Sequence, residues 1–216
     1  MPCRCCREAY EDFFNEKLAE KDARRYRRRG LDAAGGTIVG FLKARGVGGE
    51  KVLEVGGGVG ALQLELLAAG AAGAENVELS PAYEAAAREL AREHGVEDRV
   101  SRRVGDFVAT AGDVAPADVV LLHRVVCCYP NLDALLGAAA ERAQHRLVLT
   151  YPPHNLVSRA VVSLLNFAQR VRRHEFRVFV WPRREINRVA ESRGLVRVRE
   201  ARASLVWRWA AFERPT

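Results

Sequence analysis

The hydrophobic residues of this chain follow two spacings, which alternate along the sequence. Short apolar or alternating runs, typical of β-strands, occupy residues 51–55, 75–79, 99–104, 117–126 and 145–153. Stretches with the apolar spacing of amphipathic helices occupy residues 61–70, 81–94, 131–143, 155–173 and 182–194. Strands that alternate with helices predict right-handed βαβ crossovers and a mostly parallel sheet with helices on both faces.

The two ends of the chain depart from this alternation. Residues 7–29 carry an apolar stripe at helical spacing, and a second helix is expected at 32–45. Residues 195–214 alternate and break at Ala203-Ser204, which predicts an antiparallel pair of strands. We therefore expect an α/β fold: a Rossmann-like, doubly wound, mostly parallel seven-stranded sheet with an antiparallel edge hairpin and an N-terminal helical extension.

Length and composition agree with one such domain. The 216 residues are enough for a single full-sized core, and 49% of them are hydrophobic. We divide the chain into a helical extension, residues 1–45, and a main domain, residues 46–216, with an insert at about 154–181. No apolar run approaches the roughly 18 residues of a membrane-spanning helix. The first residues are charged and contain no apolar leader core, so we expect a cytoplasmic protein.

The net charge of +7 is unevenly distributed. Residues 1–50 carry 11 basic and 8 acidic side chains, residues 51–154 carry 9 and 14, and residues 155–216 carry 14 and 5. The basic blocks "RRYRRRG" and "RVRRHEFR" could bind phosphates, but they lack an interleaved aromatic platform for bases. We favour solvated helix faces, place an anionic substrate second, and regard nucleic acid as the weakest explanation.

Five cysteines stand in two groups, "CRCC" near the start and "VVCCYP" at Cys127 and Cys128. An odd number of cysteines without a leader segment argues against a disulfide framework. The first group lacks the two separated Cys-x-x-Cys pairs of a zinc ribbon. We therefore predict free thiols and no metal site.

Four glycines follow the first predicted strand, in the stretch "KVLEVGGGVGALQLELLAAG". The spacing Gly56-x-Gly58-x-Gly60 allows a tight turn and close approach of a ligand to the backbone, whereas Gly57 is expected only to be tolerated. The dinucleotide fingerprint is G-x-G-x-x-G, so the third glycine comes one residue early for NAD. No lysine follows Gly60, which argues against a Walker loop for nucleoside triphosphates.

An ordered set of motifs resembles the class I S-adenosylmethionine-dependent methyltransferases. "VLEVGGGVG" is similar to their first motif, and "ENVELSP", "VGDF", "VVLLHRVVCCYPN" and "HRLVLTYPP" match the ends of the next four strands. The resemblance covers about residues 30–150, and the alternating tail fits the last two strands of that family. The overall pattern is most similar to small-molecule members near the magnesium-protoporphyrin O-methyltransferase group.

This resemblance implies that the cofactor is S-adenosylmethionine (SAM) and assigns residues to it. Glu78 would accept hydrogen bonds from the ribose hydroxyls. The alternative is that Glu78 is only an ordinary solvent-facing residue at a strand end. Asp106 and Phe107 would frame the adenine, although an aspartate that caps the next turn is a rival explanation. Glu54 would lie beneath the methionyl part, because a buried carboxylate needs partners. The remaining implied contacts are Gly56, Gly58, Gly60 and Leu79.

Methyl transfer from a sulfonium requires alignment of the acceptor and, for a hydroxyl or carboxylic acid, removal of its proton. His123 follows the fourth strand of the sheet, and the ordinary pKa of a histidine suits a base at neutral pH, although it could equally serve only to hold its loop. We place it among the cofactor contacts as well. Tyr151 and His154 are second candidates at the end of the fifth strand. Tyr129 and Cys127 are expected to line the same crevice.

The flanking segments are expected to select the acceptor. The helical extension could act as a lid in which Tyr26 and Arg29, or Arg27, contact the cofactor. The insert offers an apolar face beside arginines 170, 172 and 173, which would suit a mid-sized hydrophobic acceptor with a carboxylate. The alternative is that this face packs on the sheet and the arginines are solvated.

Two other functions stay open. A nucleic-acid methyltransferase, acting for example on RNA, would explain the arginines, but neither "CCYPN" nor "YPPHN" matches a base-methylating Asn-Pro-Pro-Tyr motif. A non-catalytic protein that binds SAM as a scaffold is the second alternative. We expect an enzyme with a small-molecule acceptor.

Overall fold

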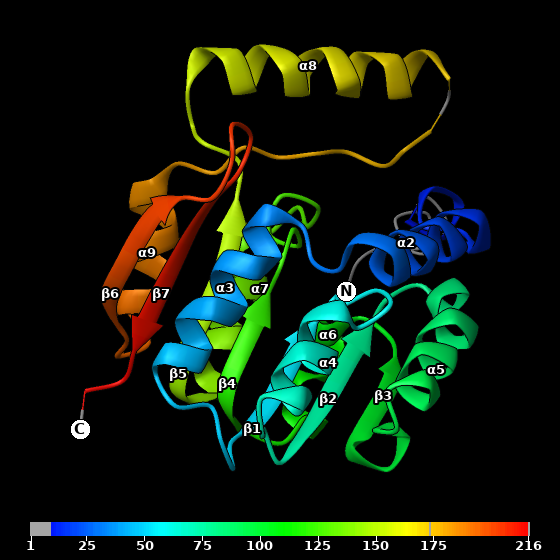
Figure 1. The fold of residues 1–216 in the computed structure, drawn as a ribbon. Helices are drawn as coiled ribbons and strands as arrows, with labels where there is room; N and C mark the ends of the chain where they lie inside the picture. The colour runs from blue at the N-terminus through cyan, green and yellow to red at the C-terminus, as the bar shows by residue number, and fades with distance from the viewer. Residues whose placement is uncertain (1–9, 173, 216) are drawn as a thin grey trace.

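The computed structural model describes residues 10–172 and 174–215. One sheet runs through the molecule in the strand order β3-β2-β1-β4-β5-β7-β6 (Figure 1). Its strands are β1 Lys51–Val55, β2 Gly73–Glu78, β3 Val100–Val104, β4 Ala117–Leu122, β5 Ala143–Tyr151, β6 Val196–Arg202 and β7 Arg208–Glu213. The helices are α2 Glu16–Arg29, α3 Ala33–Ala44, α4 Ala61–Ala68, α5 Glu84–Glu93, α6 Phe107–Thr110, α7 Leu132–Arg142, α8 Leu156–Val171 and α9 Arg183–Glu191.

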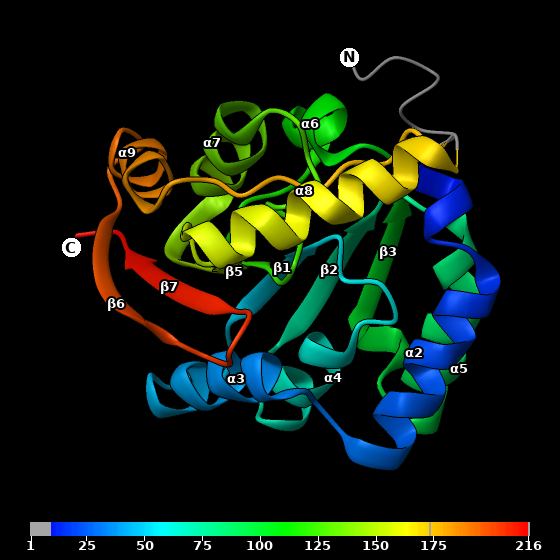
Figure 2. The same cartoon turned by 90° about the horizontal axis from the view of Figure 1, so that it is seen from above.

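Helices cover both faces of the sheet. Figures 1 and 2 show α3, α4 and α5 on one face and α6, α7 and α9 on the other. The side chains of β4 alternate accordingly: Val119 and Leu121 belong to one core cluster, and Val120 and Leu122 to the other. A strand buried on both faces needs apolar residues at every position, which explains its continuous apolar run.

The pairing confirms the predicted fold class. Strands β1 to β5 pair in parallel, whereas β7 pairs antiparallel with both β5 and β6 at the sheet edge. The predicted fourth strand, residues 117–126, is too long, because the chain leaves the sheet after Leu122. Helix α7 passes directly into β5, so that strand begins at Ala143, earlier than the sequence suggested. The division at residue 45 stays a prediction.

Capping residues define the ends of the N-terminal helices, and burial attaches these helices to the core. Asn15 and Asp32 accept backbone hydrogen bonds at the starts of α2 and α3, and Gly30 ends α2 with positive φ. Ala19, Ala23 and Tyr26 of α2 lie in the same core cluster as residues of α4 and α5. The helical extension is therefore part of the packed structure beside the sheet.

The insert takes a different course. Helix α8 lies above the carboxyl ends of the parallel strands, and none of its residues is buried (Figures 1 and 2). The described part of residues 174–181 returns beneath it without joining the sheet, and Phe176 is buried there. None of the helices in the described ranges is long and apolar enough to cross a membrane.

The doubly covered strand β4 should dominate the stability of the core. Leu121 is fully buried at the centre of the sheet, so Leu121→Ala should lower the free energy of unfolding by about 2–5 kcal/mol. The matched change Leu205→Ala removes a side chain that is 80% exposed and should change it by less than about 0.5 kcal/mol. Urea unfolding of both variants measures the difference, and equal effects would contradict this description of the core.

Candidate functional site

A cavity opens at the carboxyl ends of β1, β2 and β4. The strand order reverses between β1 and β4, which is where doubly wound sheets bind ligands. The N-terminal segment contributes the opposite wall through Tyr10, Phe14 and the link between α2 and α3. Nine of the residues that the sequence assigned to the cofactor or to catalysis line this cavity: Tyr26, Glu54, Gly56, Gly58, Glu78, Leu79, Asp106, Phe107 and His123.

Four other residues singled out in the sequence lie outside the cavity. Gly60 precedes α4 as its N-cap, and Arg29 is exposed on the last turn of α2. Tyr151 is buried in the core, and its hydroxyl donates to a glutamate of β6 at 2.9 Å. His154 is exposed in the loop before α8. Tyr151 and His154 therefore do not line the cavity in this structure.

The glycine loop lies flat against buried polar groups. Its three spaced glycines have positive φ, between 56° and 80°, which glycine adopts readily. Gly57 does not have positive φ, yet a Cβ there would lie 2.2 Å from Asn76 Nδ2 and 2.6 Å from Glu54 Cδ. The expectation that Gly57 is only tolerated was wrong, because the contact beneath the loop leaves no room for a side chain.

Glu54 is the most deeply buried acid of the site, at 1% exposure. Burial raises its pKa from 4.5 to about 8, although the charge of Arg102 and the amide of Gln63 oppose the shift. Its Oε2, like both amide atoms of Asn76, has no hydrogen-bond partner among the described residues. A buried oxygen of this kind fits a donor group of a bound ligand or an ordered water.

Glu78 ends β2 and is also buried. The amide of Gly58 donates to its Oε2 at 2.8 Å, and the amide of Ser80 donates to its Oε1 at 3.0 Å. Burial raises its pKa, and these two amides together with Arg102 oppose that shift. Each carboxylate oxygen keeps a second lone pair, so the group can also accept hydrogen bonds from a diol. It is not a solvent-facing strand end.

Asp106 caps the turn that follows it, as the alternative explanation from the sequence requires. Its Oδ1 accepts from the amide of Val108 at 3.0 Å and so caps α6. The Tyr129 hydroxyl donates to Oδ2 at 3.3 Å, and both residues line the cavity. Phe107 is buried beside them and adds an apolar wall. Capping therefore fixes this carboxylate at the cavity rather than withdrawing it.

His123 lies between two polar groups. Its Nδ1 is 3.2 Å from Thr150 Oγ1, and its Nε2 is 3.6 Å from Asp32 Oδ1. Burial alone would raise the pKa of Asp32, but the contact with His123, the amide of Gly35 and the charge of Arg124 outweigh it and hold that pKa well below its usual range. The carboxylate therefore stays ionised beside the imidazole.

Sequence reasoning missed Asp32 and Arg124, which both line the cavity. The Arg124 guanidinium pairs with Asp32 and lies 5.2 Å from the ring centroid of Trp207 in the β6–β7 turn. Arg124 has a φ of 62°, a strained value for a residue other than glycine. The local signal for Asp32 was its position as an N-cap before "AAGG", which indicates a helix start and not a site.

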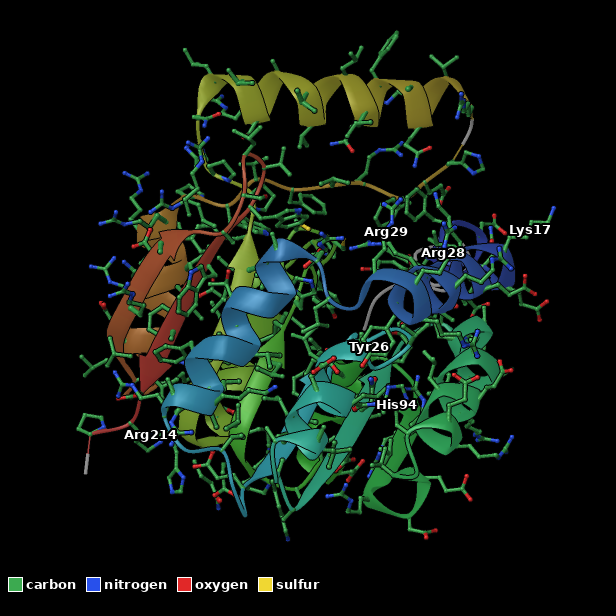
Figure 3. The ribbon with its side chains drawn as sticks, viewed as in Figure 1. Lys17, Tyr26, Arg28, Arg29, His94 and Arg214 are labelled. Carbon is green, nitrogen blue, oxygen red and sulfur yellow. The ribbon has the colours of Figure 1, made fainter. Side chains whose placement is uncertain are left out.

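Two lid residues proposed from the sequence have other partners. Figure 3 shows Tyr26 directed from α2 toward the sheet side, where its ring stacks on His94 with centroids 5.6 Å apart. Its hydroxyl donates to Glu65 at 3.2 Å. Arg27 makes hydrogen bonds to Glu93 and does not line the cavity. Of the two, Tyr26 alone lines the wall of the site.

The end of the cavity formed by the N-terminal segment is aromatic. Tyr10 and Phe14 line it and stack at 4.9 Å, and the Phe176 ring packs edge-on against both. The sequence pointed instead to the apolar face of α8 as this wall, and that expectation was wrong. No residue of α8 lines the cavity, because its apolar side chains face solvent.

The two described cysteines are free thiols, with sulfur atoms 3.5 Å apart. Cys128 lines the cavity in place of the expected Cys127, which is buried. Cys3, Cys5 and Cys6 lie outside the described residues. Within residues 10–172 and 174–215, no cluster of three or more His, Cys, Asp or Glu side chains could hold a metal ion.

Comparisons with known proteins point to one family. A family model described as "Methyltransferase domain" matches residues 10–200. The fold is similar to magnesium protoporphyrin IX methyltransferase from Synechocystis PCC 6803 with bound SAH, at a TM-score of 0.76 and 20% identity over 95% of this chain and 98% of that one. The same enzyme with bound SAM gives a TM-score of 0.76 and 20% identity over 97% of each chain.

A more distant likeness is to a putative RNA methyltransferase from Pyrococcus horikoshii, at a TM-score of 0.61 and 16% identity over 85% of each chain. At such identities these likenesses establish the fold. No curated protein sequence matched the chain.

The buried acid makes stability depend on pH. The folded pKa of Glu54 lies above its unfolded value of 4.5, so the unfolded chain loses this proton first as pH rises. The wild type should therefore lose stability between about pH 4.5 and 8 relative to Glu54→Gln, on the order of a few kcal/mol. Thermal melts across this range, without cofactor, measure the difference in stability between the wild type and Glu54→Gln. Glu191→Gln, which changes an exposed side chain, is the control. A constant gap would show that Glu54 is ionised throughout.

Proposed function

The chain belongs to the methyltransferase domain family, and on that premise we propose that it transfers the methyl group of SAM to a small hydrophobic or anionic molecule. SAM supplies the activated methyl group on its sulfonium. The observation that carries the proposal is the convergence of the glycine loop, Glu78 and Asp106 on one wall of the cavity, with His123 and Asp32 on another. The cofactor and the acceptor thus have separate sets of side chains.

The residues of the first wall fit the cofactor. Glu78 presents two oxygens, held by backbone amides, to a ribose diol. The unpartnered Oε2 of Glu54 suits the methionyl end, beneath backbone that no side chain covers. Asp106, fixed by its capping contact, can accept from the exocyclic amine of adenine, and Phe107 provides the apolar surface beside it.

The residues of the second wall can accept a proton from the acceptor. His123 accepts the proton of a hydroxyl or carboxylic acid, and the ionised Asp32 beside it stabilises the imidazolium that forms. Arg124 pairs with the same carboxylate and fixes its orientation. Asp32 is therefore a positioning residue, and His123 the residue that touches the acceptor.

The acceptor class follows from the lining. Tyr10, Phe14 and Leu31 give an apolar surface suited to a flat or aromatic molecule. Arg25, which also lines the cavity and lies 3.6 Å from Asp32, adds a cation near the rim. An aromatic or polycyclic carboxylate or phenolate matches both features.

Cofactor binding is tested by thermal stabilisation with SAM, S-adenosylhomocysteine and NAD in parallel. The first two should raise the melting temperature, by the equivalent of about 2.7 kcal/mol at a hundredfold excess over Kd, and NAD should not. Glu78→Ala should remove most of this stabilisation. Glu75→Ala on the same strand should retain it. Stabilisation by NAD alone would refute the proposal.

Proton transfer is tested with labelled SAM and a panel of aromatic carboxylates and phenols. On an accepted substrate, His123→Asn should lower kcat by about 10²–10⁴. Asp32→Asn keeps a good N-cap but removes the charge that stabilises the imidazolium, so it should lower kcat by more than it changes KM. The control is His145→Asn, a change of an exposed histidine at the far end of β5. An unchanged rate in His123→Asn would contradict its role.

A further inference from the structure

Helix α8 turns its polar side toward the molecule. Its less exposed positions are Ser158, Val162, Asn166 and Gln169, which recur at helical spacing and mark the inward side. Three of these four residues are polar. An amphipathic helix of a globular protein normally shows the reverse orientation, with its apolar stripe against the core.

The outward side of α8 is apolar along its whole length. Its large side chains are between 51% and 80% exposed: Leu156, Val157, Val161, Leu164, Leu165, Phe167 and Val171. The helix has 16 residues, which makes this surface about 24 Å long. Contiguous apolar patches of this kind mark interaction sites.

Hydrogen bonds fix this orientation. The Asn166 side chain donates to the carbonyl of Val178 at 2.8 Å and accepts from its amide at 2.9 Å. The segment that contains Val178 is itself anchored, because the amide of Phe179 donates to Cys127 at 2.7 Å and the Trp181 indole donates to Val126 at 2.8 Å. The apolar face is thus held outward by its own polar side.

The charge around this face is positive. Residues 156–172 contain no acid, and Arg159, Arg170 and Arg172 are exposed. The β6–β7 turn, which contains the 80% exposed Leu205, reaches toward α8 (Figure 1). Exposed apolar residues beside arginines are typical of helices that lie in the surface of an anionic bilayer.

We propose that α8 docks in the plane of an anionic lipid surface and holds the carboxyl edge of the sheet, with its cavity, toward the bilayer. Apolar side chains of the outward face would enter the acyl boundary, and the arginines would contact lipid phosphates. This inference is independent of the reaction catalysed.

A second copy of the chain fits this face less well. A contact through one face of a helix about 24 Å long falls short of the roughly 800 Å² per partner of a stable interface. Two such helices would also bring their arginines together without any acid on either helix. The charge pattern therefore favours lipid.

Co-sedimentation of the full chain with vesicles tests the proposal. Binding to vesicles of equal parts phosphatidylglycerol and phosphatidylcholine should exceed binding to phosphatidylcholine alone and should weaken with salt. Leu164→Glu should weaken binding at least about tenfold, because it places a charge in the acyl boundary. Val196→Glu, the same change at an exposed valine of β6, should not.

A second variant keeps the test independent of helix packing. Arg159→Gln combined with Arg170→Gln leaves the apolar face intact and should weaken binding to the anionic vesicles about thirtyfold, since each arginine contributes about fivefold. Sedimentation equilibrium without lipid reports the oligomeric state. The proposal is overturned if the chain binds neither vesicle type or binds both equally. It is also overturned if the chain forms a dimer that Leu164→Glu dissociates and does not bind vesicles.

Discussion

The close contact between the glycine loop and the buried acid beneath it is the constraint on which the site depends. Gly57 lies directly over Glu54 and Asn76, so at this point the cavity is lined by backbone and not by a side chain. The same loop donates its Gly58 amide to Glu78, which links the ends of β1 and β2. A side chain at Gly57 would lift the loop from both carboxylates. The cavity exists because this turn can approach its own strand so closely.

The opposite wall depends on segments that are distant in sequence. Asp32 from the start of α3 contacts His123 after β4, and Thr150 of β5 contacts the other side of that imidazole. Arg124 joins the same carboxylate to Trp207 near the C-terminus. An ionised carboxylate in a largely buried cluster is stable only with such partners, so the N-terminal helices and the final hairpin are held together by the chemistry of the site.

The sequence predicted well what local pattern and strand topology determine. Parallel strands end at one edge, so residues placed after them, such as Glu78 and His123, had to meet there. It did not predict Asp32 as a site residue. The sequence identifies a helix cap, but it does not show what the carboxylate contacts besides the helix amide. It placed Tyr151 at the cavity, but alternation along β5 directs Thr150 toward His123 and Tyr151 into the core on the other face. Periodicity gave the apolar face of α8 but not the direction in which that face points.

The orientation of α8 costs free energy in water, and that cost connects the two proposals. A free amphipathic helix would rotate its leucines and Phe167 toward the protein, yet Asn166 and the anchored segment beneath it keep them outward. Burial of each such side chain is worth about 1.5–3 kcal/mol, so an exposed face of this size is stabilised when an apolar phase covers it. Because α8 lies above the carboxyl edge of the sheet, the same contact would bring the aromatic wall of the cavity close to that phase. A hydrophobic acceptor with an anionic group partitions into that boundary, where a surface-bound enzyme would meet it at high local concentration.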